Sequence, residues 1–334
     1  MNKKSILITG GTGSFGKRFI KTVMSKYKPK KLIVFSRDEQ KQFNLQKLFP
    51  ERVDSPIRYF LGDVRDYERI NYALKDVDIV IHAAALKHVP IAEYNPFEVI
   101  KTNVIGAQNI IQSCLYNKVK KVIALSTDKA CSPINLYGAT KLASDKLFVA
   151  ANNYKGKLST KFSVVRYGNV MGSRGSVIPY FLKQIKKKEI NITDLKMTRF
   201  NITLNEGVSF VIKSLDMMIG GEIFVPKIPS YKISDLANAI CPNSKVKITG
   251  IRPGEKINEE MVSVHDSINT LETKKFYVIT PSLKFRNFKS EFLKKFKNAK
   301  SCKKDFCYNS RDNSKFLTIK EIKQLIIKNK NDFE

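Results

Sequence analysis

Two residues of one short segment, Tyr137 and Lys141, have the types and the spacing of an acid/base pair. They are four positions apart, so in a helix that starts near Leu136 both side chains would project from one face. An ammonium beside a phenol favours the phenolate and would lower the pKa of the tyrosine from about 10. Tyr137 would then act as a base toward the hydroxyl of an alcohol or a sugar during hydride transfer.

A few residues earlier, Thr127, Asp128 and Lys129 add an acid and a base that hydride transfer alone does not need. A lysine is a base only when it is neutral, which requires that burial or nearby cations lower its pKa from about 10.4. Lys87 and Lys141 would be such cations. We expect this group to serve a second chemical step, whereas in a plain epimerase or reductase Asp128 and Lys129 would be incidental loop charges.

Three glycines at regular spacing lie between an apolar run at residues 4–9 and a helical segment that continues to about Tyr27. Between a strand and a helix, such glycines let the backbone turn tightly, and a pyrophosphate rests on the first amides of the helix. The segment therefore predicts a dinucleotide site, with Gly10, Thr12, Gly13, Ser14, Phe15 and Gly16 as its residues.

The end of the second expected strand indicates which dinucleotide binds. An acidic residue at this point would hold the ribose hydroxyls of NAD, but the sequence reads Ser36, Arg37 and Asp38, with Lys41 one turn later. Two cations suit the 2′-phosphate of NADP, so we expect NADP as the cofactor. Asp38 keeps NAD open as an alternative.

The ends of the next two strands supply further residues of the cofactor site. Asp63 and Val64 follow the third strand and would meet the adenine. Small side chains follow the fourth strand, where either the ribose and pyrophosphate pass or helix and sheet pack closely: Ala83, Ala84 and Ala85. Lys87, Tyr137 and Lys141 would complete the site.

Strand-like and helix-like segments alternate along the first half of the chain. The expected strands are residues 4–9, 31–36, 57–63, 78–85, 120–127 and 161–168, and the segment at 96–117 reads as one helix. This order predicts an α/β fold, a doubly wound parallel sheet of the Rossmann type. We expect an NADP-binding domain at residues 1–168, to which later segments can return. Residues 169–334 would form mainly a smaller substrate lobe with a packed C-terminal tail.

Composition excludes several classes of protein. Of the 334 residues, 43% are hydrophobic, but no apolar run is long enough to span a membrane, so we expect a cytoplasmic protein without membrane insertion. The net charge of +30 could indicate nucleic acid, yet no nucleic-acid-binding motif is present and the lysines are scattered, as on a solvated surface. Three histidines and five cysteines without a CxxC pair predict no metal site and reduced thiols.

Several motifs together resemble a known family, the inverting UDP-N-acetylglucosamine 4,6-dehydratases of the extended short-chain dehydrogenase/reductase superfamily. The motifs are ITGGTGSFGK, FSRDEQK, GDVRD, HAAALKHVP, STDKACSPINLYGATK, VRYGNVMGSRGSVIPYF, MTRFNITLNEG and IRPGEK, which span residues 6–256. Two positions depart from the family pattern. Asn201 stands where an aromatic residue is expected, and Asn258 where a histidine is usual, so both put fine substrate preference in question.

The resemblance implies a dehydration of UDP-N-acetylglucosamine in which NADP is returned unchanged. Tyr137 would remove the C4 hydroxyl proton while hydride passes to NADP. Lys129 would take the C5 proton, and Asp128 would protonate the departing C6 hydroxyl. Hydride would return to C6, and C5 would be reprotonated on the opposite face. The product would be UDP-2-acetamido-2,6-dideoxy-β-L-arabino-hex-4-ulose, a step toward pseudaminic acid or a related surface or flagellar glycan.

The resemblance also implies the residues that bind the sugar nucleotide and a homo-oligomeric assembly, with a hexamer as the form that the family suggests. The substrate residues would be Lys87, Lys129, Asn169, Val177, Ile178, Pro179, Tyr180, Phe181, Arg199, Arg252 and Glu255. For Arg252 the alternative is a salt bridge with Glu255 that only fixes a turn.

Three other readings of the sequence stay open. A retaining dehydratase resembles this chain but carries Asp-Glu in place of Asp128-Lys129, and a 4-epimerase of the same superfamily needs only the Tyr137/Lys141 pair. A non-catalytic NADP-binding regulator is a possibility of the fold alone. Thr127, Tyr137 and Lys141 are all present, which argues against such a regulator.

Overall fold

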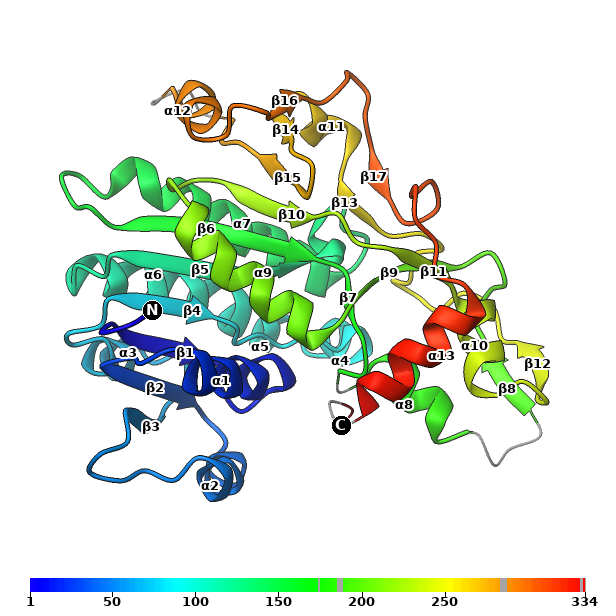
Figure 1. Ribbon diagram of the computed structural model, residues 1–334, viewed down its shortest axis with the longest axis horizontal. Coiled ribbons are helices and arrows are strands. Elements are labelled where there is room, and N and C mark those ends of the chain that lie inside the picture. The colour runs from blue at the N-terminus through cyan, green and yellow to red at the C-terminus, as the bar shows by residue number, and fades with distance from the viewer. Residues whose placement is uncertain (174, 185–188, 283–286, 331–332, 334) are drawn as a thin grey trace.

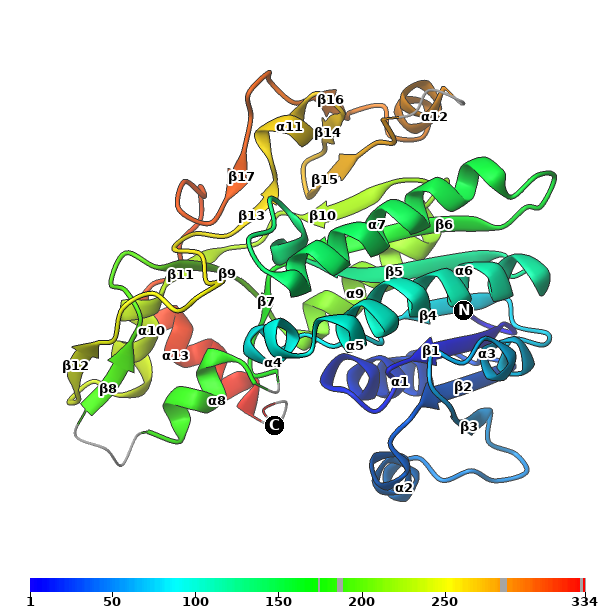
Figure 2. The same ribbon diagram turned by 180° about the vertical axis from the view of Figure 1, so that it is seen from behind.

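The computed structural model describes residues 1–173, 175–184, 189–282, 287–330 and 333 (Figure 1). A twisted central sheet carries helices on both faces, and a smaller lobe lies at one end of its strands (Figures 1 and 2). The expected fold class, a doubly wound α/β sheet with a second lobe, is confirmed. The basic stretch at residues 185–188 lies outside the described residues.

Seven parallel strands form the main part of the sheet. In spatial order they are β3 (Ile57–Leu61), β2 (Lys31–Ser36), β1 (Ser5–Thr9), β4 (Ile79–His82), β5 (Lys121–Thr127), β6 (Lys161–Tyr167) and β10 (Ile223–Pro226). The order in which successive strands are added to the sheet reverses between β1 and β4, which is the switch point at which ligands bind in folds of this kind. The expected strand at 78–85 ends at His82, so that Ala83–Ala85 belong to the loop at this switch point.

The strand residues alternate between two apolar cores, one on each face of the sheet. Ile6 and Ile8 belong to the core beneath α1 (Ser14–Lys26) and α9 (Leu204–Met217), the helices nearest the viewer in Figure 1. Leu7 belongs to the core on the opposite face. The helices on that face are α3 (Tyr67–Ala73), α6 (Gly106–Tyr116) and α7 (Leu136–Tyr154), seen in Figure 2, and α2 (Glu39–Leu48) lies at the β3 edge.

The segment expected to be one helix at 96–117 is broken in the middle. It consists of α5 (Pro96–Ile100), a π-helical turn (Lys101–Ile105) and α6, and α4 (Val89–Tyr94) precedes it. The π-helical turn carries Asn103, whose amide bonds both the N–H and the C=O of Leu86, each at 2.9 Å. The Asn103 side chain in this π-helical turn therefore fixes the loop that leaves β4.

Segments beyond residue 168 return to the sheet. After β10, three antiparallel strands extend it: β15 (Phe276–Ile279), β14 (Thr270–Glu272) and β16 (Lys300–Ser301). Two helices accompany these strands: α11 (Val264–Ser267) and α12 (Phe288–Lys295).

The rest of the C-terminal half forms the lobe, with an apolar core of its own that includes Ile178, Phe181, Leu236 and Ile322. Its helices are α8 (Val177–Leu182), α10 (Ile233–Ile240) and α13 (Ile319–Lys328). Its strands are β7 (Asn169–Val170), β9 (Thr198–Ile202) and β11 (Ser230–Lys232) in one sheet, and β8 (Glu189–Ile192) and β12 (Lys245–Ile248) in another. A separate pair, β13 (Glu260–Val262) and β17 (Tyr308–Asn309), packs Met261, Val262 and Tyr308 into a core of the main sheet.

The C-terminal tail is packed structure. A capping box between Thr318 and Glu321 starts α13, and Ile322 on this helix is buried in the lobe core. Among the described residues, no helix is long and apolar enough to cross a membrane.

Candidate active site

The glycine-rich segment forms the turn from β1 into α1, and α1 begins at Ser14 with Gly13 as its N-cap. A Cβ added at Gly16 would lie 2.4 Å from the carbonyl oxygen of Gly11, so only a glycine lets the helix pack this closely on the turn. Gly10 adopts a φ of +64°, in the left-handed region that favours glycine. The local sequence thus builds a helix N-terminus against which a pyrophosphate can rest.

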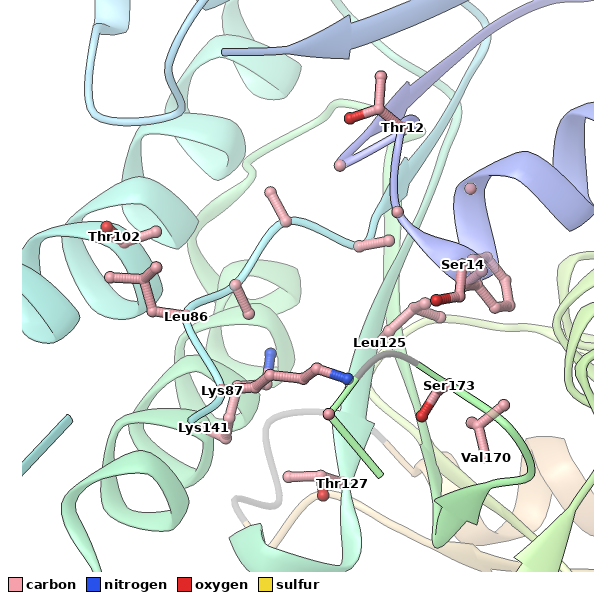
Figure 3. Close-up of a pocket in the computed structure, with 18 of the residues that line it drawn as sticks. Thr12, Ser14, Leu86, Lys87, Thr102, Leu125, Thr127, Lys141, Val170 and Ser173 are labelled. Carbon is pink, nitrogen blue, oxygen red and sulfur yellow. The ribbon is translucent and has the colours of Figure 1, made fainter. Parts of the chain in front are cut away.

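A cavity of about 570 Å³ extends from this turn to the turn that follows β5 (Figure 3). All the residues predicted to bind the cofactor line it, namely Gly10, Thr12, Gly13, Ser14, Phe15, Gly16, Ser36, Arg37, Asp38, Lys41, Asp63, Val64, Ala83, Ala84, Ala85, Lys87, Tyr137 and Lys141. The five predicted catalytic residues line the same cavity. They are Thr127, Asp128, Lys129, Tyr137 and Lys141.

At the end of β2, acidic and basic side chains are paired. The Arg37 guanidinium lies 3.8 Å from the Asp63 carboxylate. Asp38 accepts a hydrogen bond from the Lys41 N–H at 2.9 Å as the N-cap of α2, and its carboxylate also pairs with the Lys41 ammonium. The Asp38 carboxylate is therefore engaged by its own helix, while both cations lie at the wall of the cavity.

The carboxyl ends of β1 and β4 are tied together beneath the cavity. The Thr9 hydroxyl lies 2.9 Å from His82 Nδ1 and accepts hydrogen bonds from the N–H groups of Ala83 and Ala84, at 3.1 and 3.2 Å. Burial lowers the pKa of His82 to about 3, so this histidine is neutral and structural. In the part of the chain that the structure describes, no group of His, Cys, Asp and Glu side chains could hold a metal ion.

The turn after β5 and the start of α7 lie against each other. A Cβ added at Gly138 would lie 2.1 Å from the carbonyl oxygen of Lys129, so the helix approaches the turn more closely than any other residue would allow. The turn is a 3-10 helix, Asp128–Ala130. This close contact places Tyr137, on the first turn of α7, beside Asp128 and Lys129 at one end of the cavity.

Tyr137 and Lys141 lie on one face of α7, as predicted, and both are largely buried. Burial raises the pKa of Tyr137 to about 12, and the Lys129 ammonium and a side-chain hydrogen bond with Thr127 act in the opposite direction. Burial also lowers the pKa of Lys141, against the effect of Asp145 one turn further along the helix. The predicted lowering of the Tyr137 pKa is therefore wrong, because burial outweighs the effect of the nearby Lys129 cation.

Lys129 lies between two buried carboxylates. Its Nζ is 3.0 Å from Asp128 Oδ1 and 3.1 Å from Glu259 Oε1. Burial disfavours the ammonium, but the two negative charges outweigh that effect and raise the pKa of Lys129. The prediction of a lysine made neutral by Lys87 and Lys141 is wrong, because its close neighbours are anionic.

Asp128 has one oxygen engaged and one without a partner. Its Oδ1 accepts hydrogen bonds from the Thr127 hydroxyl at 2.9 Å and from Lys129 Nζ at 3.0 Å. Its Oδ2 is buried and has no hydrogen-bond partner among the described residues. Burial raises the pKa of Asp128, since desolvation disfavours the carboxylate. A buried carboxyl group of this kind is suited to carry a proton and to donate it.

The residues predicted to bind substrate are more scattered than the cofactor residues. Asn169 lines the cavity with Lys87 and Lys129. Arg199 is buried and donates to the carbonyl oxygens of Thr198, Lys256 and Ile257. On these contacts, Arg199 holds the lobe together at the edge of the site.

The other predicted substrate residues do not line the cavity. Ile178 and Phe181 are buried in the lobe core, and Tyr180 on the same helix is 47% exposed. The helix α8 also carries Val177 and Pro179. Arg252 is exposed and its Nε lies 3.2 Å from Glu255 Oε2, which is the turn-fixing pair that the sequence left open. A role for these residues in binding substrate stays a prediction.

Comparisons with known proteins identify the family. Residues 6–281 match the family described as "Polysaccharide biosynthesis protein". The chain belongs to this family. It is 58% identical over 330 residues to "UDP-N-acetylglucosamine 4,6-dehydratase (inverting)" of Campylobacter jejuni subsp. jejuni serotype O:2, covering 97% of this chain and 98% of the relative. The resemblance to inverting dehydratases is thus confirmed.

Other members of the polysaccharide biosynthesis family and solved structures give a wider comparison. A "UDP-glucose 4-epimerase" of Rickettsia bellii is 41% identical over 334 residues, with 97% of this chain and 95% of the relative covered. The solved structure of Pen from Bacillus thuringiensis has a TM-score of 0.88 at 40% identity and covers 98% of both chains. A dTDP-glucose 4,6-dehydratase from Streptomyces venezuelae, solved with NAD and TYD, shares the fold with a TM-score of 0.67, at 21% identity and with 76% and 86% of the chains covered.

Two buried carboxylates next to the cavity, Glu259 and Asp145, were not predicted from the sequence. Glu259 contacts Lys129 from a segment far along the chain, so no spacing pattern points to it. Asp145 accepts a hydrogen bond from Ser126 at 2.7 Å and pairs with the buried Arg166 at 3.2 Å. Asp145 is four residues after Lys141, so its helical spacing was a usable signal.

The cavity is also lined by residues that were not predicted from the sequence. They are Phe35, Gly62, Leu86, His88, Thr102, Leu125, Ser126, Tyr167, Gly168, Val170, Ser173, Gly175, Ser176 and Leu204. Most lie in the loops next to named motifs, and Leu204 starts α9 at the lobe side.

Proposed function

We propose that the protein is a configuration-inverting UDP-N-acetylglucosamine 4,6-dehydratase. One observation carries the proposal: a single cavity is lined by the Tyr137/Lys141 pair, by the buried Asp128 and by the partly exposed Lys129. Oxidation at C4 and elimination across C5 and C6 act on one bound sugar, so both sets of groups must reach it together. The curated Campylobacter relatives of that name, 58% and 57% identical, support this assignment.

The cofactor that we propose is NADP, which supplies reversible transfer of a hydride. The glycine turn before α1 would hold its pyrophosphate. Arg37 and Lys41 would hold the 2′-phosphate, whose two negative charges would compete for the cations that now pair with Asp63 and Asp38. The engagement of Asp38 as a helix cap favours NADP over NAD, because that carboxylate is already satisfied by its own helix.

The first proton movement belongs to Tyr137, which would accept the proton of the C4 hydroxyl. Its pKa of about 12 would have to fall for this role, and Lys129 and the Thr127 hydroxyl already act in that direction. Lys141 is only 3% exposed and would contribute a buried positive charge at the end of the cavity where Tyr137 lies. Lys129, Thr127 and Lys141 would together position and activate the Tyr137 phenol.

The elimination belongs to Asp128 and Lys129. Lys129 would take the C5 proton, which the C4 ketone makes acidic, and Asp128 would donate a proton to the departing C6 oxygen. The unpartnered Oδ2 of Asp128 supports its role as the acid. A lysine at position 129, where retaining enzymes carry a carboxylate, supports inversion, because a carboxylate there could take and return the proton on a single face.

The deciding experiment is incubation of the pure protein with UDP-N-acetylglucosamine in D2O, with the product followed by NMR. We expect a 4-keto product of L-arabino configuration that carries deuterium at C5. A D-xylo 4-keto product as the first species formed would assign the protein to the retaining dehydratases instead.

A UDP-hexose 4-epimerase is the second candidate, because relatives at 41% and 40% identity are named UDP-glucose 4-epimerase. An epimerase has no use for the buried acid Asp128 next to Lys129, which favours the dehydratase. Incubation with UDP-glucose separates the two functions: conversion to UDP-galactose without loss of water would favour the epimerase.

We infer that the lobe residues Asn169, Val177–Phe181, Arg199, Arg252 and Glu255 bind the sugar nucleotide once the lobe adjusts to it. We place the protein in the cytoplasm, where its five unpaired thiols would stay reduced, as a homo-oligomer, with a hexamer as the specific proposal. Its product would lead toward pseudaminic acid or a related surface sugar.

A further inference from the structure

The contact between Lys129 and Glu259 serves no step of the proposed dehydration. Glu259 is 1% exposed and does not line the cavity, and its Oε1 lies 3.1 Å from Lys129 Nζ. Burial of a carboxylate is costly unless its charge is matched, so a glutamate at this depth needs a reason. Lys129 is its nearest cation, with Arg199 Nε at 3.8 Å as the second.

We propose that Glu259 is a positioning residue that holds Lys129 Nζ at the sugar and makes Lys129 a stronger base toward C5. The proposal rests on the proposed function and deepens it, since it names the group that adapts a lysine for removal of a proton from carbon. Glu259 would not touch the substrate, because it does not line the cavity, and it would act only through Lys129.

The backbone holds Glu259 firmly in place. Its N–H donates to the Ser310 hydroxyl at 2.9 Å, and its C=O accepts from the Ser310 N–H at 2.8 Å. The Ser310 hydroxyl also contacts the Thr198 hydroxyl at 2.6 Å, which ties this segment to β9. The carboxylate is therefore presented to Lys129 by a segment that is hydrogen-bonded to Ser310 and, through it, to β9.

The charges around Lys129 show how Glu259 raises the proton affinity of the Lys129 amine. Asp128 and Glu259 face Lys129 directly and favour the ammonium, whereas Arg199 disfavours it; the phenols of Tyr137 and Tyr231 also lie within its electrostatic reach. Lys129 and Arg199 lower the pKa of Glu259, so this carboxyl is ionised. Lys256 lies beyond Glu259 and adds to the same effect.

The higher proton affinity of Lys129 has a chemical use. Before elimination, the Lys129 ammonium gives one proton to the Asp128 carboxylate, which leaves an amine and a carboxylic acid. The amine then takes the C5 proton, and the acid gives its proton to the C6 oxygen as the C6–O bond breaks and water leaves. One proton transfer thus prepares both groups, and a higher pKa of the conjugate acid makes the amine a better base for a carbon acid.

The test compares Glu259→Gln with Glu259→Asp and with Glu260→Gln as a matched control. Glu260 is the next residue, and its carboxylate accepts from the Ser132 hydroxyl instead of contacting Lys129. The first measurement is the pH dependence of deuterium incorporation at C5 of UDP-N-acetylglucosamine. We expect the alkaline limb of this profile, where Lys129 loses the proton that it shares with Asp128, to move to lower pH by about one to three units in Glu259→Gln, together with a lower plateau. The limb should stay near its wild-type position in Glu259→Asp and Glu260→Gln.

The second measurement does not depend on turnover. Competitive labelling of lysines with acetic anhydride across a pH series, read by mass spectrometry, gives the protonation midpoint of Lys129 in the holoenzyme. We expect this midpoint to lie above the ordinary value of about 10.4 in the wild type and to fall in Glu259→Gln. A wild-type midpoint at or below that value would overturn the proposal, even if Glu259→Gln does not fold. A uniform loss of rate in Glu259→Gln without movement of the alkaline limb would also overturn the proposal. Absence of dehydration by the wild type with a raised midpoint would instead count against the proposed function alone.

Discussion

The two ends of the cavity are built in different ways. At the glycine-loop end, defined by residues 10–16 and 36–41, the contacts join residues that are close in the sequence, such as Gly16 with Gly11 and Lys41 with Asp38. At the proton-transfer end, defined by residues 127–141, the decisive contacts come from far along the chain, and Lys129 depends on Glu259. A local motif is therefore enough to reveal a cofactor loop, whereas the charge state of a catalytic group depends on distant neighbours.

The largest effect should come from the proton-transfer end. Tyr137→Phe removes one oxygen from a buried ring and should leave the fold intact, while loss of the general base lowers turnover by roughly 10²- to 10⁴-fold. Steady-state product formation measures the loss, and circular dichroism checks the fold. Tyr116→Phe, at a tyrosine that is 72% exposed, is the matched control. A rate near that of the wild type in Tyr137→Phe would make the Tyr137/Lys141 pair structural.

Lys129→Ala should divide the reaction into its two halves. We expect the elimination to fall by about a hundredfold or more, because the base for C5 is lost, while some oxidation at C4 continues. Absorbance of the reduced nicotinamide at equilibrium with substrate reports the oxidation, and NMR reports the product. Normal product formation would show that Lys129 is an incidental loop charge, as a plain epimerase would predict.

Gly138→Ala tests the close contact that joins the turn after β5 to α7. Because the new Cβ would lie 2.1 Å from a backbone carbonyl oxygen, we expect a loss of about 1–3 kcal/mol in the free energy of unfolding and a displaced Tyr137. Gly207→Ala in α9 is the control, since its nearest neighbours would lie 4.0 Å away. That variant should gain about 0.5–1 kcal/mol. Denaturant unfolding compares the two, and equal stabilities would contradict the close approach.

The smallest effect should come from the glycine-loop end. Arg37→Asp replaces a cation at the proposed 2′-phosphate site with a carboxylate, so we expect the affinity for NADP to fall by about tenfold or more relative to NAD. Calorimetry on cofactor-stripped protein measures both dinucleotides, and the exposed Arg52 serves as a control site for the same substitution. Equal affinity of the wild type for NADP and NAD would remove the basis for the choice of cofactor.

Much of the fold could be predicted from the sequence because its signals are local. Apolar runs that end in glycine or polar residues predicted the strands, and the observed β2 has the predicted bounds, 31–36. The helix expected at 96–117 was wrong in its middle, because a π-helical turn there serves a tertiary contact from Asn103 to Leu86. A pattern of side chains carries no sign of such a contact.

The sequence alone was sufficient for the chemistry that depends on residue type and short spacing: a glycine turn for a dinucleotide, Tyr137 and Lys141 on one helical face, and an acid beside a base at Asp128 and Lys129. Only the tertiary structure decided how those groups are charged. Lys129 is an ammonium because Asp128 and the distant Glu259 both contact it, and burial raises the pKa of Tyr137. Proton affinity depends on desolvation and on charges within a few ångströms, and folding, not sequence spacing, brings those charges together.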